Sequence, residues 1–331
     1  MLGPGTKEGD TEDIWTTIRT IYTGYLTPKS MEPGSILIVG VGGIGCKWSS
    51  HAHAKCQQLS EMLLVDADES SFSSEFEAHC LHLDAAGSGK GTAALPNLAA
   101  HRLNEGVANI QEMLKNSELV IILAALGGGT GSGAAAELAA RSSESGSLVV
   151  SIVGMPFAEQ PLRCAIADKA IPAIERNSDL CIRVSLERLA WQARHRESDW
   201  KLGSEWIGEL IEGLVTTLAR VGKMNLDLMD LRTIVGRPGN ATLIVGNGAI
   251  SDPDEVVRMA RDSPLSEISI DGAKGCMIQV EGGPDMTLGH LNMVSEAFVS
   301  TLDDDCQVIL GARASDDLVG RLRLVAVVSG L

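Results

Sequence analysis

The chain is organised around the stretch Gly127-Gly128-Gly129-Thr130-Gly131-Ser132-Gly133. It follows the apolar run 119–126, which predicts a buried strand, and it precedes residues 134–140, which are rich in strong helix formers. Five glycines in seven positions let backbone N–H groups approach an anion closely, and Thr130 and Ser132 add hydroxyl donors. A flexible linker would not lie directly between such a strand and such a helix. The stretch therefore predicts a phosphate-binding loop.

Length and composition limit the class of protein. A chain of 331 residues with 44% hydrophobic residues predicts two globular domains. The net charge of −16 argues against nucleic acid as a partner and predicts that self-association is helped by salt or divalent ions. Seven cysteines without a CxxC pair are typical of a reduced cytosolic protein. With no signal peptide and no apolar run of bilayer length, the sequence predicts a soluble, cytoplasmic protein without direct membrane insertion.

A first nucleotide-binding signature occurs near the start of the chain. The predicted strand 35–39 runs into Gly40-Val41-Gly42-Gly43-Ile44-Gly45, which matches GxGxxG, and a second strand at 63–68 contains Asp66. These residues alone do not separate an NAD(P) dehydrogenase or an adenylating enzyme of the ubiquitin-activating type from a further nucleotide-binding class.

A second Gly-rich loop covers residues 87–92 and precedes a helix predicted over 98–114. It imitates a Walker A loop, but Lys90 is followed by Gly91, so a Mg²⁺-binding hydroxyl would be out of register. We interpret it as a loop that senses a terminal phosphate, with a plain surface turn as the alternative.

Beyond the central loop, strands are predicted at 148–153 and 180–184 with helices between them. This alternation predicts a Rossmann-like, doubly wound parallel sheet. Glu159 and Arg163 are four residues apart at the start of a helix, and their spacing alone favours an ion pair on a solvated face.

The second half of the chain begins with a polar loop at 192–203 and a long helix predicted from Ser204 to Gly222. Next comes Asn225-Leu226-Asp227-Leu228-Met229-Asp230-Leu231-Arg232-Thr233. Its carboxylates form either a set of Asx turns or a pair that orients a water or contributes to a Mg²⁺ shell.

The remainder predicts an α+β domain with a mixed sheet. Its predicted strands are 241–245, 275–280, 307–311 and 321–329, and its helices are 254–260 and 288–302. The expected organisation is an N-terminal extension with an amphipathic helix (1–30), a nucleotide-binding domain (31–203), a central helix (204–224) and a C-terminal domain (225–331).

Five motifs in this order resemble the tubulin/FtsZ superfamily, and its FtsZ branch in particular. They are GVGGIG, the 87–92 loop, GGGTGSG, the stretch PFAEQPLR at 156–163 and NLDLMDLRT at 225–233. The likeness extends from about residue 35 to residue 331. It implies a GTPase that polymerises head to tail into protofilaments, hydrolyses GTP at the subunit interface and serves cell division or the cytoskeleton.

The resemblance also implies roles for residues. GTP or GDP would be held by Gly42, Gly43, Gly45, Lys47, Asp66, Gly89, Lys90, Gly91 and the loop from Gly127 to Gly133. Glu159 and Arg163 would contact the ribose, and Glu205 the guanine. On the next subunit Asn225, Asp227 and Asp230 would be catalytic, and Asp227 and Asp230 would also bind Mg²⁺. The implied partners are a second copy of the chain and division or membrane-adaptor proteins.

Some positions depart from the family pattern. Ile44, Cys46 and Lys47 interrupt the first loop, Leu186 lies where an Asn would read guanine, and Glu205 replaces an Asp. One alternative is therefore a nucleotide-binding scaffold of the same family with weak or lost hydrolysis or assembly. Another, resting on the first strand-helix-strand unit alone, is a Rossmann-type dehydrogenase or adenylating enzyme.

Overall fold

The computed structural model describes residues 31–32, 34–72, 77–83, 91–195, 204–237, 239–262, 269–300 and 302–331, without the side chains of residues 192, 195, 204 and 205. Several sequence predictions lie outside the described residues. These are the N-terminal extension 1–30 with its amphipathic helix, Gly89, Lys90, most of the predicted loop 192–203 and the side chain of Glu205.

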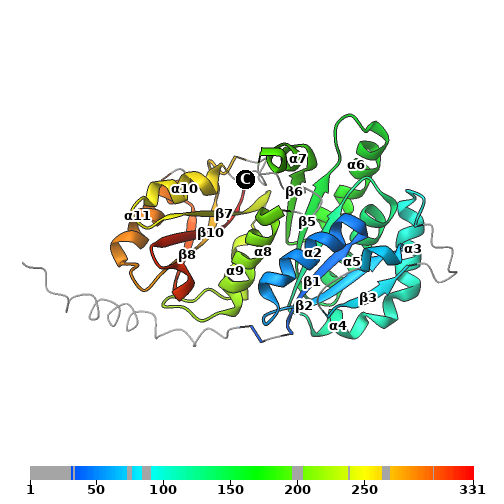
Figure 1. The fold of residues 1–331 in the computed structure, drawn as a ribbon, viewed down its shortest axis with the longest axis horizontal. Coiled ribbons are helices and arrows are strands. Elements are labelled where there is room, and N and C mark those ends of the chain that lie inside the picture. Colours follow the sequence, from blue (N-terminus) through cyan, green and yellow to red (C-terminus); the bar gives the residue numbers. More distant parts are fainter. Residues whose placement is uncertain are drawn as a thin grey trace, which may run out of the picture.

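The first domain is built on a six-stranded parallel sheet with strand order β3-β2-β1-β4-β5-β6 (Figure 1). The strands are β1 (Ile36–Val41), β2 (Glu61–Asp66), β3 (His79–His82), β4 (Leu119–Ala125), β5 (Leu148–Met155) and β6 (Leu180–Ser185). The central strands β1, β4 and β5 are almost fully buried because helices cover both faces of the sheet. The predicted doubly wound sheet is confirmed.

Different helices cover the two faces of this sheet. One apolar cluster joins the sheet to α2 (Gly42–Cys56), α7 (Leu186–His195) and α8 (Ser204–Ala219). The other joins it to α3 (Pro96–Gly106), α4 (Gln111–Asn116), α5 (Gly129–Glu144) and α6 (Pro161–Arg176). Short 3₁₀ turns at Glu69–Phe72 and Val107–Asn109 complete the described part of this domain.

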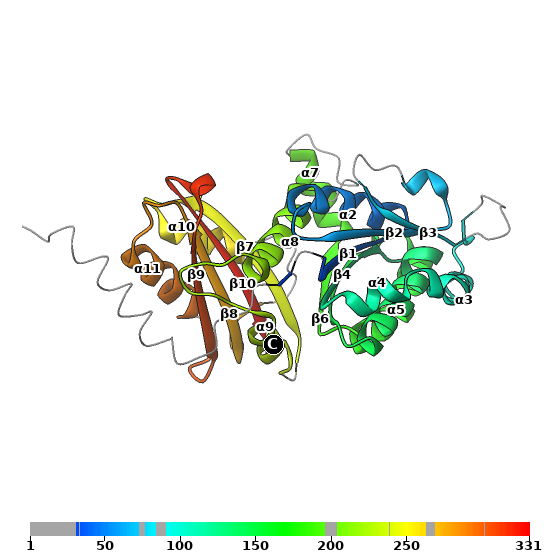
Figure 2. The ribbon, with the colours of Figure 1, turned by 90° about the horizontal axis from the view of Figure 1, so that it is seen from below.

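The second domain is a four-stranded mixed sheet with order β7-β10-β8-β9 (Figure 2). Its strands are β7 (Ala241–Ala249), β8 (Gly275–Gly282), β9 (Gln307–Ala314) and β10 (Arg321–Ser329). Only β8 and β9 pair in parallel; β10 pairs antiparallel with β7 and β8. Helices α10 (Pro253–Arg261) and α11 (Leu288–Val299) pack on one face, and α8 with α9 (Leu228–Val235) on the other. The predicted mixed sheet is confirmed.

Several predicted helices differ from the structure. Helix α5 begins at Gly129, so most of the stretch 127–133 that was expected to be a loop forms its first turns. The single helix expected over 98–114 is divided into α3, the 3₁₀ turn and α4, and α3 ends at Gly106, a residue type that weakens helices. A Cβ at Gly106 would lie 3.0 Å from Leu81 Cδ1, so glycine allows close packing there. Helix α8 ends at Ala219 rather than Gly222. In addition, α7 reaches His195 and so enters the stretch that was predicted as a loop. Within the described residues, every helix is too short or too polar to span a membrane.

Candidate functional site

A cavity of about 730 Å³ lies at the carboxyl ends of the parallel strands. It opens between the end of β1 at Val41 and the end of β4 at Ala125. These strands are neighbours in the sheet, but the chain leaves β1 towards β2 and leaves β4 towards β5, so the strand order reverses between them. Ligands of doubly wound sheets bind at this switch point.

Two helices begin at this cavity, and both lack an N-terminal cap. Helix α2 starts at Gly42 and α5 starts at Gly129, each directly after its strand or loop. Neither has a side-chain cap hydrogen bond or an acidic residue in its first turn. Helix N-termini carry unpaired N–H groups and a partial positive charge, which suit an anion. Two such helix N-termini facing one cavity are suited to binding a polyphosphate.

The glycines of the stretch 127–133 are required for different structural reasons. At Gly131 and Gly133 a Cβ would lie 2.1 and 1.9 Å from the carbonyl oxygens of Ala125 and Pro96, so these positions are closed by backbone. At Gly128 a Cβ would have no neighbour within 4 Å, and Gly128 lines the cavity. Gly128 therefore keeps space open for a ligand, whereas the other two allow close packing of α5.

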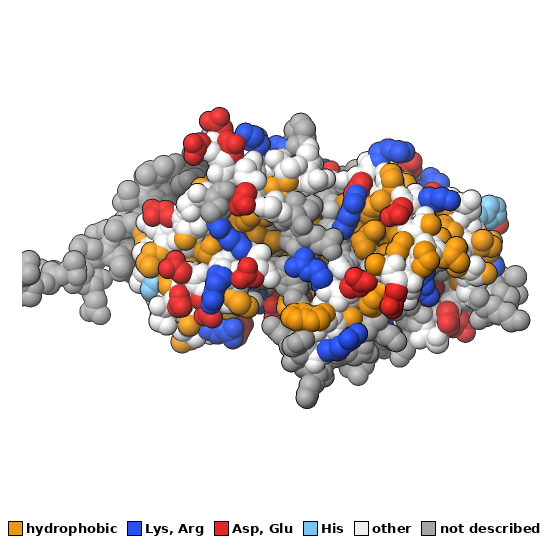
Figure 3. Space-filling view, turned by 90° about the horizontal axis from the view of Figure 1, so that it is seen from above, with side chains coloured by type: hydrophobic (Ala, Val, Ile, Leu, Met, Phe, Trp, Pro, Cys, Tyr) orange, Lys and Arg blue, Asp and Glu red, His pale blue; other side chains and the backbone are white. Residues whose placement is uncertain are grey.

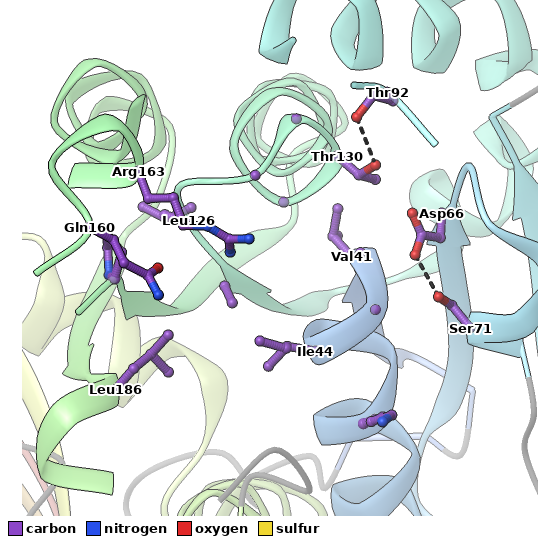
Figure 4. A pocket seen from close by; sticks show the side chains of 18 of the residues that line it. Val41, Ile44, Asp66, Ser71, Thr92, Leu126, Thr130, Gln160, Arg163 and Leu186 are labelled. Atoms are coloured by element: carbon purple, nitrogen blue, oxygen red, sulfur yellow. Dashed lines mark hydrogen bonds between the residues drawn. The ribbon is translucent and has the colours of Figure 1, made fainter. Parts of the chain in front are cut away.

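Hydroxyls and one carboxylate form the polar end of the cavity (Figure 4). Thr92 Oγ1 lies 3.3 Å from Thr130 Oγ1, and Asp66 Oδ2 accepts a 2.6 Å hydrogen bond from Ser71 Oγ. Asp66 Oδ1 accepts from the N–H of Ala67, so the nearly buried carboxylate is held in place. Lys47, on the first turns of α2, adds a positive charge to the lining.

The opposite end of the cavity is largely apolar and carries one amide (Figure 4). Ile44 and Leu186 line it together with Phe157 and Gln160. The side chain of Arg163 reaches from α6 towards the middle of the cavity. A largely apolar end suits the flat face of a base, and Gln160 is able to donate or accept a hydrogen bond there.

The structure brings together only part of the predicted nucleotide set. The predicted residues that line the cavity are Gly42, Gly43, Lys47, Asp66, Gly128, Gly129, Thr130, Gly131 and Arg163. The predicted residues that lie outside its lining are Gly45, Gly91, Gly127, Ser132, Gly133 and Glu159. Ser132 Oγ accepts a hydrogen bond from the N–H of Gly127 and so shapes the loop, and Glu159 is exposed in the turn before α6.

Sequence reasoning missed several lining residues. Ser70 and Ser71 follow Asp66 by one helical turn, and a polar pair so close to a strand-end acid is a signal that was available. Thr92 lies in the second Gly-rich loop but was not singled out. Gln160 gave no signal, because the i, i+4 spacing of its neighbours Glu159 and Arg163 attracted the interpretation instead.

The predicted catalytic residues lie elsewhere, in a loop between α8 and α9. We call residues 220–227, with Asp230 in the first turn of α9, the acidic loop. Asp227 Oδ1 accepts from the N–H groups of Met229 and Asp230, and Asp230 Oδ2 accepts from the N–H of Asp227, which makes a capping box. Asn225 Oδ1 accepts from the N–H of Gly222.

These hydrogen bonds leave one oxygen of each carboxylate available. None of the hydrogen bonds of the described residues engages Asp227 Oδ2 or Asp230 Oδ1. Burial raises the pKa of Asp230 above its ordinary value, although the hydrogen bond from the N–H of Asp227 acts in the opposite direction. Two carboxylates fixed by backbone N–H groups, each with a second oxygen open, fit the donor chemistry of a divalent cation or of an oriented water.

The acidic loop and the cavity lie at opposite ends of the molecule. Lys55 lies almost four turns along α2 from Gly42, where the helix begins at the cavity, or about 20 Å. Its Nζ lies 3.9 Å from Glu212 Oε2 of α8. The loop follows two turns beyond Glu212 and lies at the lower edge in Figure 1, whereas the arrowheads of β5 and β6 point to the upper edge. The acidic loop therefore cannot reach the cavity of its own chain.

Two family models match successive parts of the chain. The GTPase domain of the tubulin/FtsZ family matches residues 35–192, and the C-terminal domain of the FtsZ family matches residues 239–331. The chain belongs to the tubulin/FtsZ family. Its order of a six-stranded parallel sheet, a central helix and a four-stranded mixed sheet is that of FtsZ.

Similar proteins of this family come from archaea. The chain is 28% identical to cell division protein FtsZ 1 of Archaeoglobus fulgidus, over 89% of this chain and 82% of that protein. It is also 28% identical to cell division protein FtsZ 2 of Methanocaldococcus jannaschii, over 95% of this chain and 84% of that protein.

Solved structures show the same fold. An empty FtsZ dimer from M. jannaschii matches with a TM-score of 0.78 at 24% identity, covering 98% of this chain and 93% of that one. CetZ2 from Haloferax volcanii, a GTPγS-bound protofilament, matches with a TM-score of 0.73 at 18% identity, covering 89% of this chain and 93% of that one.

Within the described residues, no group of three or more His, Cys, Asp or Glu side chains forms a metal site by itself.

Proposed function

We propose that this FtsZ-like protein hydrolyses GTP at a site divided between two copies joined head to tail. The observation that carries the proposal is the separation of two groups of residues. The cavity with its two helix N-termini lies at one edge of the folded molecule, and the fixed carboxylates lie at the opposite edge. A second copy is the simplest source of the missing half.

The nucleotide half would bind GTP or GDP through the N-termini of α2 and α5. Their N–H groups would receive the phosphates, with Lys47 and Arg163 compensating charge and the Ile44–Leu186 end receiving the base. Mg²⁺, when bound, would neutralise charge on the terminal phosphate. The open oxygens of Asp227 and Asp230 are the proposed protein ligands on the other copy.

The hydrolytic half would act by orientation. Asp227 and Asp230 would accept hydrogen bonds from the attacking water and hold it in line with the terminal phosphate, while Asn225 fixes the bend of the loop at Gly222. Closing the interface would exclude bulk water from the same place.

Exposed apolar side chains border both halves. Leu95 and Leu162, on the first turns of α3 and α6, are 55% and 79% exposed beside the cavity, and Val221 and Met229 are 68% and 65% exposed beside the acidic loop. Figure 3 shows hydrophobic side chains gathered over the first domain on the face seen from above. Burying such side chains against a second copy would favour association.

The cellular role would be in division or the cytoskeleton, in the cytoplasm. The A. fulgidus and M. jannaschii relatives are cell division proteins, and the H. volcanii relative forms a protofilament. Division or membrane-adaptor proteins are the partners we expect beyond the chain itself.

Complementation between two inactive variants tests the divided site. Gly128→Asp would place a negative charge in the phosphate cradle without a clash, and Asp230→Ala would remove a loop carboxylate. Each variant alone should release no phosphate from GTP. In an equal mixture, random head-to-tail pairing should give about a quarter of the wild-type rate, because one interface in four joins an intact cradle to an intact loop.

A mixture as inactive as its components would contradict the divided site. The scaffold alternative rests on the departures at Ile44, Cys46 and Leu186. The capping box, which occupies one oxygen of each aspartate, favours it further. This alternative predicts that the wild-type protein binds GTP and assembles without releasing phosphate.

A further inference from the structure

A row of polar side chains crosses the second sheet on the face that packs against α8. Asn247 of β7, Arg323 of β10, Glu281 of β8 and Arg313 of β9 are direct register neighbours across all four strands. The next residues on this face, Val245 and Val325, contact α8 at Gly213, where the packing is apolar. We call these four residues the polar row.

The polar row is buried at Glu281 and Arg313, partly buried at Asn247 and Arg323, and joined by hydrogen bonds and ion pairs. Glu281 is fully buried, and its Oε1 accepts from Arg313 Nε at 3.0 Å and from Arg313 Nη2 at 2.8 Å. Its Oε2 lies 3.6 Å from Arg323 Nη1. Arg323 Nε donates to Asn247 Oδ1 at 3.2 Å. The carboxylate of Glu281 on β8 is thus shared by two arginines, one on each of the strands that flank β8.

Arg323 also connects the polar row to the nucleotide-binding half. Its Nη2 lies 3.4 Å from Glu212 Oε2 on α8, and the same oxygen lies 3.9 Å from Lys55 Nζ on α2. Charges therefore alternate from Lys55 through Glu212, Arg323 and Glu281 to Arg313. The line runs from the helix that begins in the phosphate cradle to the strand β9.

The far end of the row supports the acidic loop. The N–H groups of Lys223 and Met224 donate to the carbonyl of Ala312, next to Arg313, at 2.8 and 3.0 Å. The N–H of Ala312 donates back to the carbonyl of Met224 at 3.0 Å. Gly222 lies so close to β9 that a Cβ would be 2.5 Å from Ala312 O and 3.1 Å from Arg313 Cβ. The backbone of the acidic loop is thus seated on β9.

Both attachments act on one short segment of chain. Helix α8 is held at Glu212 by Arg323, and the loop that follows it is held at Met224 by β9, whose Arg313 belongs to the same row. Apolar side chains in place of buried ion pairs are often as stable or more so, so stability alone does not explain the row. A fixed charge geometry does give one register between helix, loop and sheet.

We propose that Arg323 is a positioning residue that sets the acidic loop in place by joining α8 to the Glu281–Arg313 pair. This inference rests on the divided GTPase site proposed above. It adds that the loop's fit to the neighbouring nucleotide depends on a contact far from either half-site.

The substitution Arg323→Met tests the inference. It divides the line of charges into two balanced pairs, Lys55–Glu212 and Glu281–Arg313, so neither pair is left with an unpaired partner. GTP affinity of the single chain should stay within about twofold, whereas phosphate release at saturating GTP should fall by roughly tenfold or more, because misplacement of a catalytic group by 1 Å can cost about a hundredfold. Hydrogen exchange at Lys223 and Met224 should accelerate.

Two further variants serve as controls. Arg321→Met changes the same residue type two positions earlier on β10, where the side chain is exposed, and should keep wild-type turnover and exchange. Arg323→Lys keeps the positive charge, so it should restore part of the turnover. Restoration should be incomplete, because lysine lacks the guanidinium fork that reaches Glu281, Glu212 and Asn247 together.

Mixing experiments separate a displaced loop from a damaged fold. Arg323→Met keeps its cradle, so an equal mixture with Gly128→Asp should regain about a quarter of the wild-type rate, while a mixture with Asp230→Ala should regain nothing. Arg323→Met with wild-type turnover, or with a loss that Gly128→Asp does not complement, would overturn the inference. If the wild-type protein itself releases no phosphate, the proposed function fails instead, and unchanged exchange at Lys223 and Met224 in Arg323→Met would still reject the inference on its own.

Discussion

Gly128 and Gly133 belong to one glycine-rich stretch, yet a side chain at each would meet different surroundings. A Cβ at Gly128 would enter the open cavity, and a Cβ at Gly133 would lie 1.9 Å from the carbonyl oxygen of Pro96. The backbone of Gly128 is extended, with φ −103° and ψ 172°, so an alanine fits there without strain. Both glycines belong to one sequence motif, but only Gly128 lines the cavity.

Alanine substitutions at these two positions should separate binding from stability. Gly128→Ala should leave the free energy of unfolding within about 0.5 kcal/mol of wild type and weaken GTP binding, since its methyl group occupies space meant for phosphate. Gly133→Ala should lose about 1–3 kcal/mol of stability, because the backbone of α5 must move away from α3. Urea unfolding and GTP titration of both variants measure the two effects. Normal GTP affinity in Gly128→Ala would show that the phosphates bind elsewhere.

At the scale of single elements, α9 shows how local folding and proposed chemistry share residues. Asp227 is its N-cap and Asp230 its third residue, and the two side chains bond each other's backbone N–H groups. Any carboxylate function must therefore use the remaining oxygen of each residue. The proposed site is rigid because the helix needs the same side chains in order to start.

Substitutions at Asp227 should distinguish capping from charge. Asp227→Asn keeps a cap acceptor and should retain wild-type stability while losing most GTP hydrolysis; Asp227→Ala should in addition lose about 1 kcal/mol. Asp252 caps α10 in the same domain by accepting from the N–H of Glu255, so Asp252→Asn is the matched control and should change neither property. Full phosphate release by Asp227→Asn would reduce Asp227 to a cap and remove it from the chemistry.

Elements with strong periodicity or uniform apolar character were predictable from sequence. The strand at Arg321–Ser329 occurs where it was expected. The glycine stretch 127–133 does follow β4, but α5 begins at Gly129, so most of the stretch belongs to a helix that was expected only from residue 134. The division of residues 98–114 was not predicted, although Gly106, a weak helix former, lies where α3 ends. The cavity residue Gln160 could not be found from local sequence, because only the folded sheet brings it to β1 and β4.

At the scale of the whole molecule, α8 lies between the two proposed half-sites, and the polar row would hold them in one geometry. The cradle uses the carboxyl ends of the first sheet, and the acidic loop uses β9 of the second sheet as its seat. Neither domain contains both halves. The net charge of −16 adds repulsion between copies, so association must depend on local complementarity and on screening by salt.

The dependence of GTP turnover on protein concentration tests the central claim most directly. Phosphate release per chain, measured together with light scattering, should stay near zero at low concentration and rise steeply once copies associate. GTP binding should be present throughout the titration, since the cradle is complete in a single chain. A specific rate that is the same at every concentration, including in strictly monomeric protein, would contradict hydrolysis at a divided site.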